Sequence, residues 1–497
     1  MFSPLRAISS IAQSFVGLAQ DSSEDWAKDS DLDGETLTSY SGISERMHIP
    51  LTEHQPPIFL VDGFMSFEVM GIWNRLQTHF RLISARNDVP CPKVYRLASG
   101  GVASSHDTAV SLFYQIKGGL EDFGHEHSVK SRHDRFGVEF PGMYPEWSGD
   151  RPVHIMAHSL GGNALMELQK LLDERFFVDK NGIPYATSAS WVISAAFLSS
   201  PLRGTHTTFL LGATPGSPEK IHPFSLGRAL YFSTQLWEWL DWEDGGKGWL
   251  GIHFRMSHFG IARNRSLLSF GKGLFSSDLF DNGIDNSSAD ASLVKCAQSP
   301  YKTFSTTFYR SYATIMTRED SNGREVPIPH ILPFLSTLSG YIGSYDFEKN
   351  GNGLLDACIP RQSGWHKNDG VCPLISQIHP QDCDPAHCTH FELPTPYKSQ
   401  TPTLPESLVK GHWYSSTILD CSHVDLIPGV DFPSLPKVLL GAKDFISWAS
   451  KILNPFPDFD EKALAPVPEY WLPHYRDAFM TDYTLFVARV NASLGNR

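Results

Sequence analysis

A serine within a run of small residues has the clearest chemistry in this sequence. Ala157-His158-Ser159-Leu160-Gly161 follows a short apolar run at 153–157 and precedes apolar side chains at helical spacing. A serine in a sharp strand-to-helix turn needs small residues two positions before and after it, and its Oγ then stands above the sheet at a helix N-terminus. The pattern predicts a nucleophile whose developing oxyanion can be stabilised by backbone N–H groups.

A nucleophilic serine also needs a base and an orienting acid, which in this kind of fold follow it in the order Ser, acid, His. Asp369 lies in an Asn-Asp-Gly turn before an apolar segment, and His423 precedes another apolar segment. On the residues alone, an exposed Asp-Gly turn and a solvated loop histidine remain alternative interpretations. Both residues are therefore candidates for the acid and the base.

Two further stretches carry side chains that bind metals. His125, His127 and His133 lie close together in a Gly-bearing segment, although such a stretch is more often a solvated loop. Cys383 and Cys388, with His390 nearby, fit a second metal, a local disulfide or a loop decoration. The sequence has no HExxH motif, which argues against a zinc hydrolase of the metalloprotease kind.

The elements that must position these residues can be read from apolar patterns. Strands are predicted in PPIFLV before Asp62, at 153–157 and at 191–197, and helices at 163–176, 226–240 and 435–453. The segment 346–412 is rich in Gly, Pro, Asn and His and is predicted to be mostly loop, and a Pro-rich tail follows residue 453. Strands that alternate with helices indicate an α/β fold with a mainly parallel sheet.

The composition excludes several classes of protein. The chain has 497 residues, of which 41% are hydrophobic, so it can bury a large core. Its formal net charge of −13 and its lack of basic runs argue against a nucleic-acid partner. Seven cysteines are too few for a disulfide scaffold, and no apolar run reaches the roughly 18–20 residues of a transmembrane segment. Residues 1–49 are predicted to be a disordered, acidic lead-in without a convincing signal peptide, which leaves the compartment, secreted or cytoplasmic, open.

Taken together, the motifs resemble the zinc-containing bacterial lipases of the thermoalkalophilic and staphylococcal type. The resemblance extends from about residue 56 to residue 453 and rests on ordered matches: PPIFLVDGF, GLEDFGHEHSVKSRHDRFG, YPEWSGDRPVHIMAHSLGGNAL, SSPLRGT, FRMSHFGI, GYIGSY, KNDGVCPLISQIHP and SHVDLIPGVD. It implies an α/β-hydrolase fold with a lid and zinc-binding insertions. It also implies a lipase that hydrolyses carboxylic esters of lipids through an acyl-enzyme at a lipid–water interface.

The resemblance also implies roles for particular residues. Ser159 matches the nucleophile, Asp369 the acid and His423 the base, and the backbone N–H groups of Phe64 and Leu160 match the oxyanion hole. The sequence departs from the family at Asp62, where a histidine usually precedes Gly-Phe. A carboxylate there is expected to place negative charge near the oxyanion and either to weaken catalysis or to alter the pH dependence.

Two metal sites are implied by the same resemblance. Asp107, His127 and His133 match three zinc ligands, with Asp278 as the fourth and Asp281 as its competitor. Four protein ligands leave no open position, so this zinc would be structural. For calcium, Asp425 and Asp431 correspond to ligands after the catalytic histidine, although an Asp replaces a Glu, one residue is inserted and Phe432 replaces a Pro.

The resemblance finally divides the chain. Residues 50–453 are expected to form the lipase-like domain, with a lid at about 206–262 whose amphipathic helix is 226–240, and residues 454–497 a C-terminal extension. The alternatives are a carboxylesterase or phospholipase with the same triad, or a non-catalytic lipid-binding scaffold suggested by Asp62. The retention of a Ser, an Asp and a His speaks against the scaffold. Acyl-chain preference and oligomeric state are beyond the sequence.

Overall fold

The computed structural model describes about half of the chain in continuous segments. The described residues are 55–64, 73, 80–82, 84–85, 90–99, 103–131, 133–214, 217–221, 225, 301–328, 333–346, 364–393, 404–427 and 472–495. The predicted helices at 226–240 and 435–453, and with the former most of the predicted lid, lie outside these residues. So do Asp278, Asp281 and Asp431.

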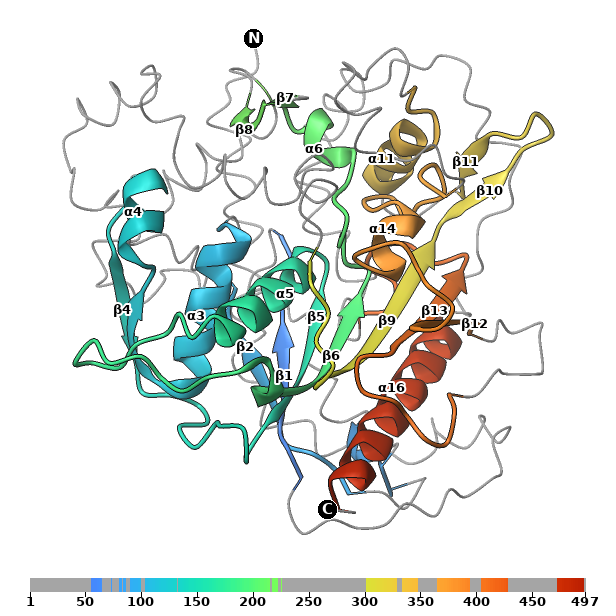
Figure 1. Ribbon diagram of the computed structural model, residues 1–497. Coiled ribbons are helices and arrows are strands. Elements are labelled where there is room, and N and C mark those ends of the chain that lie inside the picture. The colour runs from blue at the N-terminus through green and yellow to red at the C-terminus, as the bar shows by residue number, and fades with distance from the viewer. Residues whose placement is uncertain are drawn as a thin grey trace, which may run out of the picture.

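A seven-stranded sheet organises the described part of the chain (Figure 1). Its strand order is β12-β13-β9-β6-β5-β1-β2, and every neighbouring pair is parallel. The strands are β1 (Ile58–Val61), β2 (Val94–Leu97), β5 (Val153–His158), β6 (Val192–Leu198), β9 (Phe308–Ile315), β12 (Cys388–Glu392) and β13 (Trp413–Leu419). The prediction of an α/β fold with a parallel sheet is confirmed, and the three predicted strands correspond to β1, β5 and β6.

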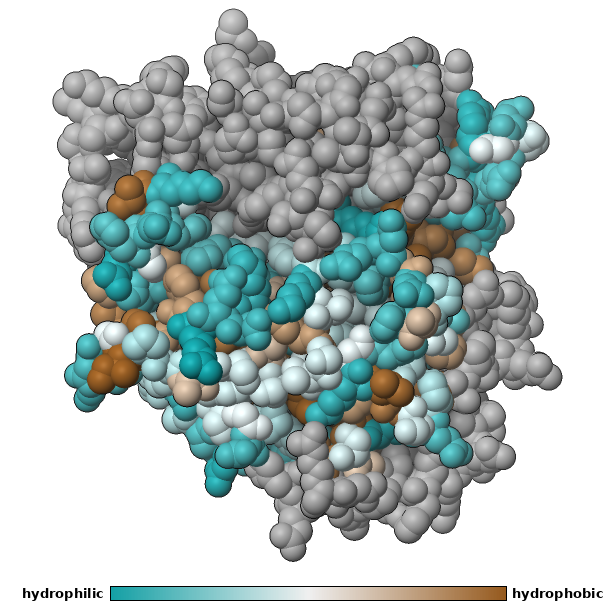
Figure 2. Space-filling model, in the orientation of Figure 1, coloured by the Kyte–Doolittle hydropathy of each residue, from teal (hydrophilic) through white to brown (hydrophobic). Residues whose placement is uncertain are grey.

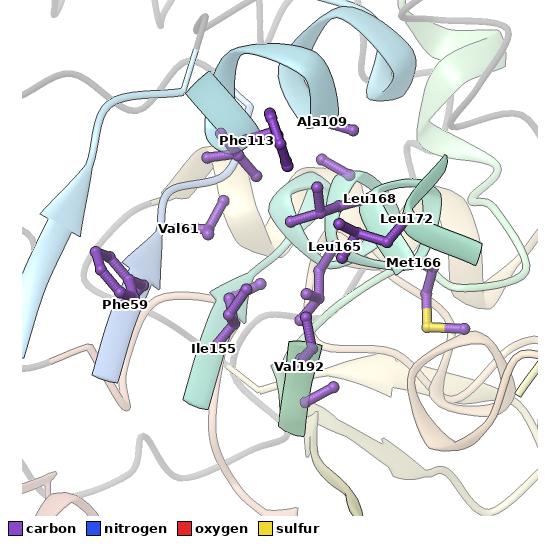
Figure 3. Packing of buried hydrophobic residues seen from close by; sticks show 14 of the residues in the cluster. Phe59, Val61, Ala109, Phe113, Ile155, Leu165, Met166, Leu168, Leu172 and Val192 are labelled. Atoms are coloured by element: carbon purple, nitrogen blue, oxygen red, sulfur yellow. The ribbon is translucent and has the colours of Figure 1, made fainter. Parts of the chain in front are cut away.

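Helices α3 (Ser105–Lys117) and α5 (Leu160–Asp173) pack on one face of the sheet. Successive strand residues point to opposite faces, so Phe59 and Val61 of β1 meet these helices. Figure 3 shows Phe113 of α3 and Leu168 of α5 closing over this face. The helix predicted at 163–176 is α5, which begins earlier because the serine turn leads directly into it.

The opposite face of the sheet is covered by α16 (Leu472–Gly495). Phe479, Tyr483 and Val487 of this helix are buried against Ile58 and Leu60, the β1 residues that point away from α3 and α5. The sequence analysis predicted only a Pro-rich tail here, and the structure corrects it: residues 472–495 complete the core. Residues from 346 to 412 were predicted to be mostly loop, but they include the short helix α14 (Leu374–Ile378) and the edge strand β12.

Smaller elements surround the sheet. Two-stranded ribbons pair β3 (Gly119–Asp122) with β4 (Phe136–Phe140), β7 (Ala213–Thr214) with β8 (Ser217–Ile221) and β10 (Thr317–Glu319) with β11 (Glu325–Pro327). The remaining helices are α4 (His125–Ser131), α6 (Thr207–Leu210), α11 (Pro333–Gly343) and a 3-10 turn at Ala189–Trp191. In the part of the chain that the structure describes, no helix is long and apolar enough to cross a membrane. Figure 2 shows the described surface of one face as mainly hydrophilic, with its apolar residues in small, separate groups.

Candidate active site

Ser159 lies in a sharp turn between β5 and α5, at the carboxyl end of the central strands. Its φ of 53° is in the left-handed region that L residues rarely adopt, so the turn is strained. The small residues around it are required by contact: a Cβ on Gly161 would clash with the carbonyl of Asp62, and one on Gly162 with the side chain of Ser200. The turn predicted from the sequence is therefore present, and it places Ser159 at the N-terminus of a 14-residue helix.

The structure brings the three predicted catalytic side chains into one hydrogen-bonded chain. The Ser159 Oγ lies 2.8 Å from His423 Nε2, and the His423 Nδ1 lies 2.8 Å from Asp369 Oδ2. The buried carboxylate accepts a hydrogen bond from Nδ1–H, which leaves Nε2 to accept the serine proton. Ser159 and His423 are each 7% exposed and Asp369 is fully buried, so the aspartate end of the hydrogen-bonded chain lies deepest in the protein.

Asp369 is held by three donors besides the histidine. Its Oδ1 accepts the backbone N–H groups of Val371 at 2.9 Å and Cys372 at 2.7 Å, and its Oδ2 accepts the hydroxyl of Thr314 at 3.1 Å. These donors hold the carboxylate of Asp369 in one orientation. They also fix which oxygen faces His423.

His423 is held through its backbone as well as its ring. Its N–H donates to the carbonyl of Asp369 at 2.8 Å, and its own carbonyl accepts Nε2–H of His158 at 3.0 Å. Burial lowers the pKa of His158 to about 3, so this imidazole is neutral at physiological pH. The residue directly before Ser159 therefore positions His423.

The two predicted oxyanion residues flank the nucleophile. Leu160 is the first residue of α5, where backbone N–H groups have no partner within the helix, and Phe64 follows the turn after β1. Gly63 brings the second segment close: a Cβ there would lie 2.6 Å from the Cβ of Ser159. These positions are compatible with a pair of backbone donors on either side of the serine.

Asp62 does not present a free carboxylate to this site. Its Oδ2 accepts from Arg96 Nη2 at 2.7 Å, and its Oδ1 accepts from the indole N–H of Trp73 at 2.5 Å. The sequence analysis expected an uncompensated negative charge here. The ion pair with Arg96 compensates that charge, so the electrostatic reason for expecting weak catalysis is largely removed.

The supporting residues could not be found from the sequence. Thr314 lies 55 residues from Asp369 in the sequence, and Gln377 bonds both the N–H and the carbonyl of Thr314. In the sequence both are polar residues beside apolar ones, near the end of β9 and within α14, and nothing there connects them to Asp369. The partners of a buried polar residue become visible only in three dimensions.

Three of the predicted zinc ligands converge at the start of α3. His127 Nε2 lies 2.8 Å and His133 Nε2 lies 3.6 Å from the same oxygen of Asp107, Oδ1. The Nδ1–H of His133 donates to the carbonyl of Asp134 at 2.8 Å, which makes its Nε2 the nitrogen available to a metal. Two imidazoles and a carboxylate are donors that zinc accepts, so these residues fit a zinc ion. His106, which the sequence analysis did not select, stacks on His127 with ring centroids 3.8 Å apart.

The described calcium candidate has protein partners. Asp425 is buried, and its Oδ2 accepts the backbone N–H of Ser422 at 2.6 Å. Its carbonyl accepts the Nε–H of Arg476 at 2.7 Å, which places a cation beside the proposed calcium ligand. This neighbourhood disfavours a second cation there, although Asp431 lies outside the described residues.

A strained serine at the end of a central strand, with an aspartate and a histidine supplied from later loops, is the arrangement of an α/β-hydrolase fold. The match to known proteins is consistent with this class. Residues 54–214 match the family model described as "Lipase-like, C-terminal domain". In sequence, the chain is 28% identical over 363 residues to a lipase of Staphylococcus hyicus, covering 66% of this chain and 49% of that protein. It is 24% identical over 355 residues to lipase 1 of Staphylococcus aureus, covering 66% and 46%.

Solved structures agree on the fold. The crystal structure of Staphylococcus hyicus lipase matches with a TM-score of 0.56 and 22% identity over 83% of this chain and 98% of that chain. EstA from Clostridium botulinum matches with a TM-score of 0.55 and 20% identity over 88% and 97%. The resemblance to staphylococcal-type lipases is therefore confirmed, and the chain spans about half the length of the curated relatives it matches.

Proposed function

We propose that this protein hydrolyses carboxylic esters of lipids by acyl transfer to water through Ser159. The observation that carries the proposal is the continuous hydrogen-bonded chain from the Oγ of Ser159 through His423 to Asp369, which begins at the strained turn between β5 and α5. A serine without a base 2.8 Å away would be a poor nucleophile at neutral pH. The three side chains come from separate loops, so their convergence is a property of the fold.

The proposed reaction has two halves. The Oγ of Ser159 bonds to the ester carbonyl carbon while His423 Nε2 takes the hydroxyl proton, and the carbonyl oxygen becomes an oxyanion between the N–H groups of Phe64 and Leu160. The tetrahedral intermediate collapses, the C–O bond to the alcohol breaks, and His423 returns the proton to the leaving alkoxide. Water then attacks the acyl-enzyme by the same route and releases the acid. Asp369 stabilises the imidazolium in both halves.

The substrate class is supported by the relatives. The staphylococcal proteins are named lipases, and lipid esters at a lipid–water interface are the substrates that this likeness suggests. The fold itself accommodates many ester substrates, so acyl length and head group must come from experiment. A carboxylesterase or phospholipase activity would use the same three residues.

We also propose metal sites and a domain division. A zinc ion that connects α3 to α4 would be held by Asp107, His127, His133 and Asp278. This zinc would be structural and would take no part in the reaction. Calcium at Asp425 and Asp431 is the weaker proposal, because Arg476 bonds the carbonyl of Asp425. Residues 50–453 form the proposed hydrolase domain, and α16 from the proposed extension packs into its core.

The test is ester hydrolysis by the purified full chain beside Ser159→Ala. Esters of short, medium and long acyl chains, an emulsified triacylglycerol and a phospholipid are assayed with zinc and calcium supplied. We expect activity in the wild type and at least a thousandfold loss in Ser159→Ala, with the acyl profile separating lipase from esterase. A folded wild type that hydrolyses none of these esters would overturn the proposal and favour a binding role.

A further inference from the structure

Cys383, Cys388 and His390 form a second cluster of potential ligands, distant in sequence from the histidines near α3. The Sγ atoms of the two cysteines lie 3.0 Å apart, and the Nε2 of His390 lies 3.3 Å from Cys388 Sγ. The donor atoms of all three residues lie within 4.8 Å of one another. The catalytic residues and the Asp107 cluster use none of these groups.

The local structure explains why these donors converge. Cys388 and His390 are two residues apart in β12, so their side chains project from the same face of the strand. Cys383 reaches them because the intervening loop turns back: the backbone N–H of Ala386 bonds the Asp384 carboxylate, and the N–H of His387 bonds the Asp384 carbonyl. A pair of cysteines separated by four residues matches the ligand spacing of many structural zinc sites.

We propose that Cys383, Cys388 and His390 bind a zinc ion that fastens the loop before β12 to the sheet edge. A disulfide is the competing arrangement, and a bond of about 2.05 Å would require the two sulfurs to approach by about 1 Å. Tetrahedral zinc, with Zn–S bonds of about 2.3 Å, would require them to separate by about 0.8 Å. The sulfur–sulfur distance does not distinguish a disulfide from a zinc site. His390 favours zinc, because its imidazole would be a third ligand of the ion, whereas a disulfide involves only the two cysteines.

Solvent access and the neighbouring contacts fit a structural role. Cys388 is buried, Cys383 is half-buried and His390 is exposed, which gives an ion an entry path from solvent. The same loop carries Asp382, whose carboxylate pairs with Arg203 Nη1 at 2.9 Å. Arg203 follows β6 near the active-site end of the sheet, so a fastened loop would also steady that turn.

Cobalt distinguishes this site from the Asp107 cluster, because only a thiolate-ligated cobalt ion gives a near-ultraviolet sulfur-to-metal charge-transfer band. The full chain is reduced, stripped of metal and titrated with Co²⁺ without oxygen. We expect the band to appear, to be displaced by Zn²⁺ and to be lost in Cys388→Ser. His390→Ala should weaken Co²⁺ binding at least tenfold, which is the loss expected when a ligand is removed.

Cys91→Ser is the matched control, since Cys91 is an exposed thiol next to β2, at the opposite edge of the sheet. It should leave the band unchanged. A reduced wild type that gives no thiolate–cobalt band overturns the proposal, whether or not the variants fold. So does a Cys383–Cys388 disulfide that mass spectrometry finds in protein purified without oxygen.

Discussion

The Nε2–H of His158 donates to the carbonyl oxygen of His423 at 3.0 Å, so the residue before Ser159 holds the backbone of His423. The ring of His158 is fully buried, and its Nε2 must keep its proton to make this bond. Two hydrogen bonds therefore hold His423 against the serine turn: one to the side chain of Ser159 and one from the side chain of His158. This doubled connection predicts that His158 contributes to catalysis without touching the substrate.

Replacing His158 by Ala should lower kcat about tenfold with little change in KM. The loss corresponds to roughly 1.4 kcal/mol, the scale of one buried hydrogen bond. Single-turnover rates on a soluble ester, together with the melting temperature, measure the effect on chemistry and on stability separately. His154→Gln is the matched control, because His154 is a buried histidine of the same strand that bonds Ser194 and Asn491 instead of the triad. Equal kcat losses in both variants would show that His158 acts only through the stability of β5.

Asp369→Asn should lower kcat by about 10³–10⁴, because an amide cannot stabilise the imidazolium and favours the wrong tautomer. Thr314→Val tests a residue that supports Asp369: it removes the hydroxyl that donates to the carboxylate of Asp369. We expect kcat to fall by less than about tenfold. The ratio of the two losses is read from kcat/KM at several pH values. A Thr314→Val enzyme as inactive as Asp369→Asn would mean that Thr314 has a direct role in the reaction.

The parts of the site that could be predicted from the sequence are those fixed by short-range geometry. The serine turn needs small residues at set spacings, so Gly161 and its neighbours reveal it in a window of a few residues. Asp369 and His423 have no such window, since they reach Ser159 across hundreds of residues, and only the resemblance to a family selected them. Their contact with Ser159 is a tertiary contact, which no short stretch of sequence contains.

The errors have the same origin. Residues 472–495 form a long helix whose buried side chains include the polar residues Thr484 and Asn491. These polar residues interrupt the apolar stripe by which an amphipathic helix is recognised in a sequence. β12 lies in a segment rich in Gly, Pro and His, where its pairing with β13 outweighs poor local propensity. The charge on Asp62 could not be judged because its partner Arg96 is 34 residues away.

His127→Ala should remove about one zinc per chain and lower the melting temperature, because a structural metal contributes its binding energy to folding. Elemental analysis of dialysed protein, beside differential scanning calorimetry with and without a chelator, measures both. His125→Ala is the control: His125 is an exposed neighbour at the start of α4 that lies outside the cluster. Unchanged zinc content in His127→Ala would exclude the Asp107 cluster as a zinc site.

The protein should lose stability as the pH falls from 6.5 towards 4, partly through His154. Burial lowers the pKa of this histidine from 6.5 to about 4. Above pH 6.5 both the folded and unfolded chains hold it neutral, whereas between these values only the unfolded chain takes up the proton. The free energy of unfolding should therefore fall by about 1.4 kcal/mol per pH unit for this group. Denaturant titrations from pH 7 to 4.5 should give a shallower slope in His154→Gln, and an unchanged slope would contradict the assignment.

The ion pair between Asp62 and Arg96 should stabilise the loop that carries Phe64, one of the two proposed oxyanion residues. Its side chains are 3% and 13% exposed, so Asp62→Asn leaves a guanidinium largely removed from water without its charge partner. We expect a loss of about 1–3 kcal/mol in the free energy of unfolding. Because Gly63 and Phe64 follow Asp62 directly, kcat should fall as well. Arg96→Met and the double variant complete a thermodynamic cycle by chemical denaturation. A coupling energy near zero would show that the two residues contribute independently and that their ion pair does not hold the loop of Phe64 in place.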